Sequence, residues 1–398
     1  MATDEQVITV DRVRPPSEFE VAGHRLRVLV EAGERLDALI DTIEGATQEL
    51  LLLYYIFCDN PVGVRVRDAL VAARGRGVAV SLIVDGFGSE GTAEGFFEPL
   101  REAGAVMCRF IPRYGRSYLL RNHQKMLIAD QRIAVIGGFN VSSAYFDPPE
   151  EQGWRDFGMR VEGETVRHLA GFYRDMEAWT LDPRAKLRTL NRIVRQWSQK
   201  EGTLRWLFGG PTRTLSPWAR AFRDDLRHGK RLDMIAAYFA PNPGAVRRLG
   251  RLARSGHARI ITASKSDNTV TIAAARHCYL RLLRRRAEIF EYRPTKLHTK
   301  LYAIDDVSYV GSANFDIRSL YINIEVMLRI EDAAVADRLR AQFDVEAAQS
   351  RRIDIPLIRA RAGRWRRFKW RIAYFIVAVM DFSVTRRINF GGVGRELD

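Results

Sequence analysis

Two short segments of the sequence repeat the same pattern of chemically reactive side chains. The first is HQKMLIAD at residues 123–130, the second is HTKLYAID at residues 298–305, and both follow the pattern HxKxxxxD. An imidazole can act as a nucleophile or as an acid and base, and a neighbouring ammonium group stabilises negative charge. The chain has only 7 His and 8 Lys, so a chance repetition would be rare. The two segments therefore indicate transfer chemistry on an anionic group.

Each segment is predicted to form a β-hairpin that holds its histidine and its lysine on one face. Residues two apart in a strand point to the same side of the sheet. The pairs that this rule places together are His123 with Lys125 and His298 with Lys300. The aspartates that complete the two motifs have the opposite parity and lie near the hairpin turn. We therefore expect them to support the catalytic groups without contacting the reacting atom; they are Asp130 and Asp305.

Small residues end each predicted hairpin, and an asparagine follows them. The first hairpin returns to Gly137-Gly138 before Asn140, and the second returns to Gly311-Ser312 before Asn314. Small side chains permit the close approach of a backbone segment or a phosphate. We therefore expect Asn140 and Asn314 to come back alongside the histidines and to bind phosphate oxygens.

The elements around both motifs follow one plan. A strand, a helix and a second strand within residues 49–84 precede the first motif, and the same order recurs within residues 232–263 before the second. This order indicates a parallel βαβ unit. Its repetition after roughly 180 residues predicts an α/β fold made by duplication, with two lobes related by a pseudo-two-fold axis.

Four segments follow from this plan. We predict a first lobe at residues 25–180, a linker rich in basic and aromatic residues at 181–214, a second lobe at 215–350 and a basic tail at 351–398. The tail has no counterpart in the first half of the chain.

The charge of the chain indicates an anionic partner. It has 398 residues with 63 Lys and Arg against 48 Asp and Glu, a net charge of +15, which suits nucleic acid, anionic lipid or a phosphorylated substrate. The three cysteines are scattered and form neither a disulfide framework nor a CxxC metal motif, which favours a reducing compartment. The amino terminus has no apolar signal-peptide core, and the longest apolar runs are shorter than the ~20 residues that cross a bilayer. A secreted or membrane-spanning protein is therefore not expected.

These features together resemble the phospholipase D superfamily, whose signature is two HKD motifs on a duplicated α/β/α sandwich that share one active site. The resemblance covers nearly the whole chain. Within the superfamily, the WRD segment at 154–156 and the segment GSANFDIRSLYINIE that ends at Glu325 look most like bacterial cardiolipin synthases. The absence of amino-terminal membrane helices places the chain nearer the short, peripheral class of those enzymes. It departs from the commoner pattern in having Ile324 where phenylalanine is usual.

The resemblance implies a role for each candidate residue. His123 would attack phosphorus to give a phosphohistidine, and His298 would protonate the departing alkoxide and then deprotonate the incoming alcohol. Asp156 and Glu325 would fix the tautomers of the two imidazoles. The groups that would stabilise charge on the phosphorane oxygens are Lys125, Lys300, Asn140 and Asn314. No metal and no cofactor is implied. The two carboxylates could instead form ordinary ion pairs, with Arg155 or Arg329.

The implied function is that of a cardiolipin synthase, peripheral on the cytoplasmic face of a bacterial inner membrane. It would transfer a phosphatidyl group from phosphatidylglycerol, or from another phospholipid, to a second phosphatidylglycerol. Water as the acceptor would make the same site a phospholipase D that produces phosphatidic acid. A nuclease and a membrane-binding scaffold without activity are further alternatives. Base-stacking platforms are not evident, so nucleic acid is the less favoured partner. The sequence leaves the oligomeric state open.

The tail can be interpreted in two ways. Residues 359–371 contain seven basic residues and no acid. Helical spacing aligns a set of apolar residues on one face, which are Trp365, Phe368, Ile372, Phe375, Ile376 and Val379. Such a helix could lie in the plane of an anionic membrane, or could pack on the domain with a solvated basic face. The amphipathic segment 184–197 and the basic segment 112–121 are further candidates for lipid contact.

Overall fold

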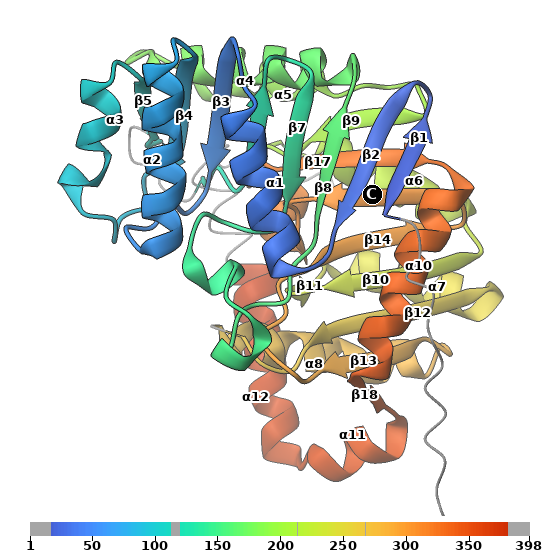
Figure 1. The fold of residues 1–398 in the computed structure, drawn as a ribbon. Helices are drawn as coiled ribbons and strands as arrows, with labels where there is room; N and C mark the ends of the chain where they lie inside the picture. The colour runs from blue at the N-terminus through green and yellow to red at the C-terminus, as the bar shows by residue number, and fades with distance from the viewer. Residues whose placement is uncertain (1–16, 113–119, 213, 267, 381–398) are drawn as a thin grey trace, which may run out of the picture.

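The computed structural model describes residues 17–112, 120–212, 214–266 and 268–380 (Figure 1). The chain forms two lobes, and each lobe contains one eight-stranded mixed sheet. In Figure 1 the first lobe, in blue and green, lies above the second, in yellow and orange. The predicted duplicated α/β architecture is confirmed.

The first lobe contains the first motif on a central strand of its sheet. Its strands run in the order β1-β2-β8-β7-β6-β3-β4-β5. The elements are β1 (Glu18–Val21), β2 (His24–Leu29), α1 (Ala32–Glu44), β3 (Glu49–Tyr54), α2 (Pro61–Gly75), β4 (Ala79–Asp85), α3 (Glu98–Glu102), β5 (Val106–Phe110), β6 (Lys125–Ala129), β7 (Ile133–Gly137), β8 (Gly158–Glu162) and α4 (Thr165–Leu181).

The second lobe repeats this plan, with strands in the order β18-β13-β12-β10-β14-β15-β17-β9. Six strands from β8 to β5 in the first sheet thus correspond in order to the six from β17 to β13 in the second. The elements are α5 (Leu187–Trp197), β9 (Leu204–Phe208), α6 (Pro217–His228), β10 (Arg231–Ala236), β11 (Phe239–Ala240), α7 (Pro243–Ser255), β12 (His257–Ala263), α8 (Thr269–Leu283), β13 (Glu288–Tyr292), β14 (Lys300–Ile304), β15 (Val307–Gly311), β16 (Phe315–Asp316), α9 (Ile317–Tyr321), β17 (Val326–Glu331), α10 (Ala333–Ala348) and β18 (Ser350–Ile353). The segment predicted as a linker forms α5 and β9, and β9 extends the second sheet beside β17.

The repeated sequence explains why the βαβ units start alike. Asn60 caps α2 by accepting the backbone N–H of Gly63 at 3.1 Å, with Pro61 as the first helical residue. Asn242 caps α7 by accepting the N–H of Ala245 at 2.7 Å, followed in the same way by a proline. A side-chain acceptor satisfies an N–H that the helix cannot, and proline suits the first turn because it has no N–H to satisfy.

The largest hydrophobic cluster joins the two lobes. It combines the inner faces of both sheets with residues of α4, α5 and α10, and its members include Leu53, Met126 and Ile136 from the first lobe and Ile235, Leu301 and Val310 from the second. Helices α1, α2 and α3 cover the outer face of the first sheet, and α6, α7 and α8 cover that of the second. Because one continuous core connects the two sheets, the lobes hold their active-site edges at a fixed mutual position.

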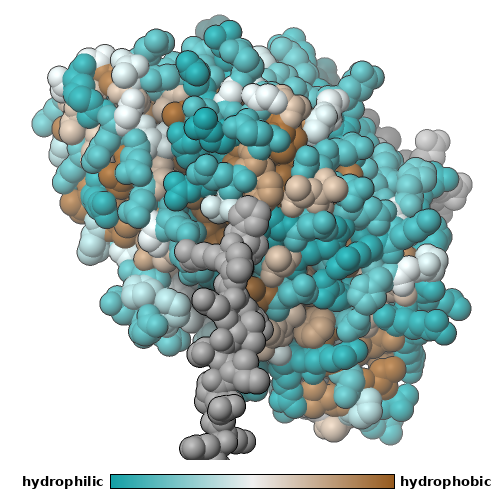
Figure 2. Space-filling model, turned by 45° about the vertical axis from the view of Figure 1, so that its right-hand side comes forward, coloured by the Kyte–Doolittle hydropathy of each residue, from teal (hydrophilic) through white to brown (hydrophobic). Residues whose placement is uncertain are grey.

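The tail forms α11 (Ile355–Arg361), α12 (Arg364–Phe375) and a final π-helical turn (Ile376–Met380). Helix α12 packs against α8 at the lower left of Figure 1. The face of the molecule in Figure 2 is mostly hydrophilic, with hydrophobic residues in small separate groups. Within the described residues no helix is long and apolar enough to span a membrane.

Candidate active site

Each HKD strand is preceded by a backbone bridge to the opposite lobe. The N–H of His123 donates to the carbonyl of Ile324 at 2.9 Å, and the N–H of His298 donates to the carbonyl of Arg155 at 2.7 Å. These two bridges are equivalent under the pseudo-two-fold relation of the lobes. In both cases the next residue of the opposite lobe is a carboxylate, so the bridges bring an acid from one lobe to the imidazole of the other.

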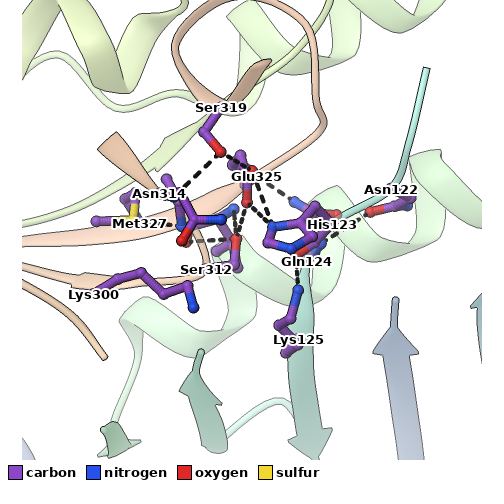
Figure 3. Close-up of polar contacts among 12 residues, drawn as sticks. Asn122, His123, Gln124, Lys125, Lys300, Ser312, Asn314, Ser319, Glu325 and Met327 are labelled. Atoms are coloured by element: carbon purple, nitrogen blue, oxygen red, sulfur yellow. Dashed lines mark hydrogen bonds and ion pairs between the residues drawn. The ribbon is translucent and has the colours of Figure 1, made fainter. Parts of the chain in front are cut away.

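The first imidazole is held by Glu325. The Nδ1 atom of His123 lies 3.1 Å from both carboxylate oxygens of Glu325 (Figure 3). The same carboxylate accepts the hydroxyls of Ser312 at 2.5 Å and Ser319 at 2.7 Å. Glu325 is fully buried, and these three partners compensate its charge. The carboxylate therefore favours the tautomer of His123 that carries hydrogen on Nδ1 and leaves Nε2 free.

The second imidazole is held by Asp156. The Nδ1 atom of His298 lies 2.7 Å from Oδ2 of Asp156, and the backbone N–H of Phe157 donates to Oδ1 at 2.7 Å. Gly138 occupies the position that Ser312 has in the other lobe. A Cβ atom on Gly138 would lie 2.4 Å from Oδ1 of Asp156, so only glycine leaves room for this carboxylate.

The alternative ion pairs for these two acids are not formed. Arg155 instead binds Glu346 at 2.6 Å and Glu31 at 3.1 Å. Arg329 binds Asp225 at 2.8 Å and 3.0 Å. Both arginines are thus occupied by other carboxylates, and the acids beside the imidazoles remain available to them.

The two motif lysines reach into the same site and are both buried. The Nζ of Lys125 donates to the carbonyl oxygen of His123 at 2.6 Å, and the Nζ of Lys300 lies 2.7 Å from Nδ1 of His298. Two imidazoles, two ammonium groups and two carboxylates therefore share one buried volume. The two lysines can donate hydrogen bonds to an anionic substrate that lies beside the imidazoles.

Burial dominates the acid–base properties of this site. Desolvation lowers the pKa of His123 to about 4 and that of His298 to about 3, against the partial compensation of the carboxylates. Desolvation also lowers the pKa of Lys125 well below its usual range. For Asp156, burial acts to raise the pKa, but the interaction with His298 and the charge of Lys300 outweigh it, so the pKa is lowered. At neutral pH both imidazoles of the unliganded site are therefore neutral.

The two asparagines line the same cavity. The side-chain oxygen of Asn140 accepts the N–H of Ile56 at 3.1 Å, and its Nδ2 donates to the hydroxyl of Tyr145 at 2.7 Å. Among the described residues the buried Oδ1 of Asn314 has no hydrogen-bond partner. The unpartnered atom of Asn314 is thus an acceptor, and its Nδ2 is the donor that a phosphate oxygen would need.

The aspartates of both motifs lie at the hairpin turns and not at the imidazoles. Asp130 accepts three consecutive backbone N–H groups, those of residues 47–49, at 2.8–2.9 Å. Asp305 accepts the N–H groups of Lys230 and Arg231 at 2.9–3.2 Å. Each aspartate ties the turn of its hairpin to the start of the neighbouring central strand, so it braces the sheet that carries the histidine.

The imidazoles open into one cavity of about 530 Å³, called here the catalytic cavity. Aromatic rings form its walls: Tyr55 lies 5.0 Å from the ring of His123, while Tyr145, Trp154 and Tyr238 lie 5.1, 5.5 and 6.1 Å from that of His298. The three tyrosines were not predicted from the sequence. Two of them, Tyr55 and Tyr238, lie just beyond the ends of the equivalent central strands β3 and β10. Their matching positions in the two repeats could have identified them from the sequence.

A larger groove of about 1490 Å³ lies along α5 and α6 and contains neither imidazole. The apolar face of α5 does not provide lipid contact, because Leu190 and Val194 are fully buried in the common core. The interpretation of segment 184–197 as a lipid-binding stripe is therefore wrong.

The basic segment 112–121 lies largely outside the described residues. In the part of the chain that the structure describes, no group of three or more His, Cys, Asp or Glu side chains is placed to bind a metal ion.

Comparison with known proteins identifies the family. A family model described as "Cardiolipin synthase, PLD-like domain" matches residues 39–166 and 224–346. The chain belongs to this family. The two matched segments each contain one HKD motif, and the two carboxylates that hold the imidazoles lie within them.

Individual relatives carry the same description. The chain is 28% identical over 345 residues to "Cardiolipin synthase 1" of Bacillus anthracis, covering 82% of this chain and 67% of that protein. It is 29% identical over 336 residues to "Cardiolipin synthase B" of Salmonella typhimurium, covering 80% and 79%.

Solved structures agree on the fold. Phosphatidylserine synthase of Haemophilus influenzae superposes with a TM-score of 0.67 and 13% identity over 92% of this chain and 94% of that one. Polyphosphate kinase of Porphyromonas gingivalis superposes with a TM-score of 0.55 and 14% identity, over 81% of this chain and 50% of that one.

Proposed function

We propose that the protein is a phosphatidyltransferase of the cardiolipin synthase type. It transfers the phosphatidyl group of one phosphatidylglycerol to the free hydroxyl of another and releases glycerol. The observation that carries this proposal is the pairing of each imidazole with a carboxylate of the opposite lobe, so that both histidines face one cavity between the lobes. Two imidazoles are what a double displacement at phosphorus needs, one as nucleophile and one as acid and base.

The first displacement forms a phosphohistidine. The free Nε2 of His123 attacks phosphorus, the N–P bond forms, and the P–O bond to glycerol breaks. His298 gives its proton to the departing oxygen, so glycerol leaves as a neutral alcohol. Lys125 and Lys300 stabilise the charge on the non-bridging oxygens, together with the amide of Asn314. Glu325 stabilises the positive charge that develops on His123.

The second displacement reverses these roles. His298, now neutral, takes the proton from the hydroxyl of the acceptor, whose oxygen attacks the phosphohistidine. The P–O bond to the acceptor forms, the N–P bond breaks, and both histidines return to their starting states.

The negative charge of the substrate favours the protonated His298 that the first step needs. In the unliganded site burial keeps both imidazoles neutral at pH 7. A phosphodiester carries one negative charge, and an anion close to an imidazole favours its protonated form. Binding of the donor lipid therefore promotes protonation of His298 by the solvent, because the anion raises its pKa.

The substrates are lipids, so we place the protein on an anionic membrane, at the cytoplasmic face of a bacterial inner membrane. The relatives' description as cardiolipin synthases supports a phospholipid as donor and as acceptor.

A product assay tests the proposed function. Purified protein is incubated with phosphatidylglycerol vesicles, with and without phosphatidylethanolamine, and lipids and glycerol are measured by mass spectrometry. We expect cardiolipin and free glycerol in equal amounts, lost in both His123→Ala and His298→Ala. Phosphatidic acid as the only product would make the protein a hydrolase. Turnover of single-stranded DNA or RNA without lipid turnover would make it a nuclease.

A further inference from the structure

Helix α12 is apolar on two opposite sides, and only one of them is covered. The covered side packs against α8 through Trp370, Ala373 and Tyr374, which are at most 9% exposed. The hydroxyl of Tyr374 donates to the carbonyl of Pro241 at 2.8 Å. The helix is thus attached to the second lobe by a buried contact of its own. The helix packs on the domain, which was one of the two interpretations of the sequence, but it does so through a face other than the predicted apolar face.

The predicted apolar face is exposed. Its described members form what we call the apolar stripe, and they are Trp365 (69% exposed), Phe368 (48%), Ile372 (43%), Phe375 (50%) and Ile376 (45%). At about 100° per residue the four members within α12 lie on the side opposite Trp370 and Tyr374, and Ile376 follows them in the π-helical turn. A run of five large apolar side chains in water is unusual for a soluble surface and indicates an interaction site.

Basic residues border the apolar stripe on both flanks. By the same helical spacing Arg364 and Arg371 lie on one flank and Lys369 on the other, and all three are exposed. Long basic side chains at the edges of an apolar helix face can reach the headgroups of a bilayer while the apolar residues enter it.

A groove beside α12 adds more positive charge. It lies between α7, α8 and Tyr374, and the basic residues that line it, called here the arginine groove, are Arg254, Arg281, Arg284, Arg285 and Arg286. No acidic side chain is among the described residues that line it. Burial lowers the pKa of His277 in this groove, and the positive charges of Arg371 and Arg281 lower it further. Arg371 of the tail therefore contributes to the same field.

The apolar stripe leads directly to the chemistry. Ile376, its last member, and the adjacent Val377 line the catalytic cavity together with Thr271 near the start of α8. The surface that carries the stripe is thus continuous with the mouth through which a lipid headgroup must reach the histidines. Acyl chains of a bound phospholipid could leave this mouth along the stripe without crossing water.

We infer that α12 docks the protein in plane on an anionic lipid bilayer, with the apolar stripe inserted and the arginine groove against the headgroups. This inference rests on the proposed function for its substrate and specifies which surface meets the membrane. Anionic lipid is the occupant that matches both the apolar stripe and its basic surroundings. The docked orientation places the mouth of the catalytic cavity at the bilayer surface.

The first test removes the apolar stripe. The variant W365S/F368S/F375S leaves the packed side of α12 unchanged, and V106S/L181S, exposed apolar residues of the first lobe, is the control. Binding to vesicles of phosphatidylglycerol and phosphatidylcholine is measured by flotation. Each partly inserted aromatic side chain contributes roughly a factor of five, so we expect about 100-fold weaker binding for the stripe variant and unchanged binding for the control. Equal binding of wild type and stripe variant would overturn the inference. So would a change from dimer to monomer with unchanged binding, since a second copy would then be the occupant.

The second test compares two variants that each lose three positive charges, one from the arginine groove and one from another surface. R254Q/R281Q/R284Q alters the arginine groove, and R188Q/R192Q/R195Q alters the groove along α5 by the same three charges. At low salt each arginine near an anionic surface contributes roughly fivefold, so we expect about 100-fold weaker vesicle binding for the first variant and little change for the second. Equal losses in both variants would overturn the assignment of this face.

A soluble substrate separates the inference from the proposed function. On dihexanoyl phosphatidylglycerol below its micelle concentration no membrane is needed, so the stripe variant should retain wild-type turnover while losing it on vesicles. If wild type binds vesicles through the stripe but turns over neither substrate, the docking surface stands and the proposed function fails. If the stripe variant loses turnover on the soluble lipid as well, the three substituted residues serve catalysis and not docking, and the docking inference is overturned.

Discussion

Replacing Glu325 by glutamine removes a buried charge while keeping the shape of the site. The carboxylate lies 3.1 Å from Nδ1 of His123 and accepts two serine hydroxyls. Glutamine can still accept one hydroxyl and donate to the other, since a serine oxygen is both donor and acceptor. The variant is therefore expected to fold, and its defect should lie in the imidazole that has lost its charged partner.

The size of the defect follows from that hydrogen bond. The bond strengthens when His123 becomes positively charged in the transition state, and a hydrogen bond to a charged group contributes about 1.5–3 kcal/mol. This corresponds to roughly a 10- to 150-fold lower kcat. KM should change little, because Glu325 touches the imidazole and not the lipid. The carboxylate also acts to raise the pKa of His123, so the pKa of this imidazole should fall below its wild-type value of about 4.

Two measurements check this prediction. Turnover of phosphatidylglycerol is measured for E325Q and for the control E331Q. Glu331 is an exposed glutamate at the end of β17, the strand that follows Glu325, and its partner is Arg329. The imidazole of His123 is titrated by NMR. A kcat within twofold of wild type would refute the role of Glu325. An unchanged pKa of His123 together with a large loss of kcat would show that the variant disturbs the structure and not the imidazole.

Three further predictions concern the supports of the site. Asp130→Asn should lower the free energy of unfolding by about 1–3 kcal/mol in chemical denaturation, because backbone N–H groups lose a charged acceptor. The kcat of the folded fraction should stay within twofold of wild type, and a tenfold loss would contradict the bracing role of Asp130. Gly138→Ser should reduce kcat at least tenfold, since its Cβ would displace Asp156; wild-type turnover would show that the carboxylate can move without cost. Below about pH 6.5, His123 and His298 bind protons in the unfolded chain but stay neutral in the buried native site. The free energy of unfolding should therefore fall as pH drops from about 6.5 to about 4, by about 1.4 kcal/mol per pH unit for each histidine. His123→Gln should show a shallower dependence in urea denaturation between pH 6 and pH 4.5, and an unchanged slope would mean that His123 is already charged in the native state.

The sequence alone determined the fold and the reactive groups. The strand–helix–strand order and the paired HxKxxxxD segments are local patterns. Such patterns can be recognised in a sequence because strand parity and helix capping act between residues that are near neighbours in the chain. Parity also separated the histidines from Asp130 and Asp305, which the structure places at hairpin turns. The tail helix was visible for the same reason, since 3.6-residue spacing needs no partner to be recognised.

Only the tertiary structure decided which carboxylate serves which imidazole. Glu325 follows the second motif along the chain and yet binds the histidine of the first, because the backbone bridge at Ile324 connects the two lobes. The same holds for the tail: the sequence showed an apolar face on α12, but only packing against α8 showed that this face stays open. Contacts between segments far apart in the chain depend on how the lobes and the tail pack, and that packing is set by the shape of the whole core, which no local pattern records.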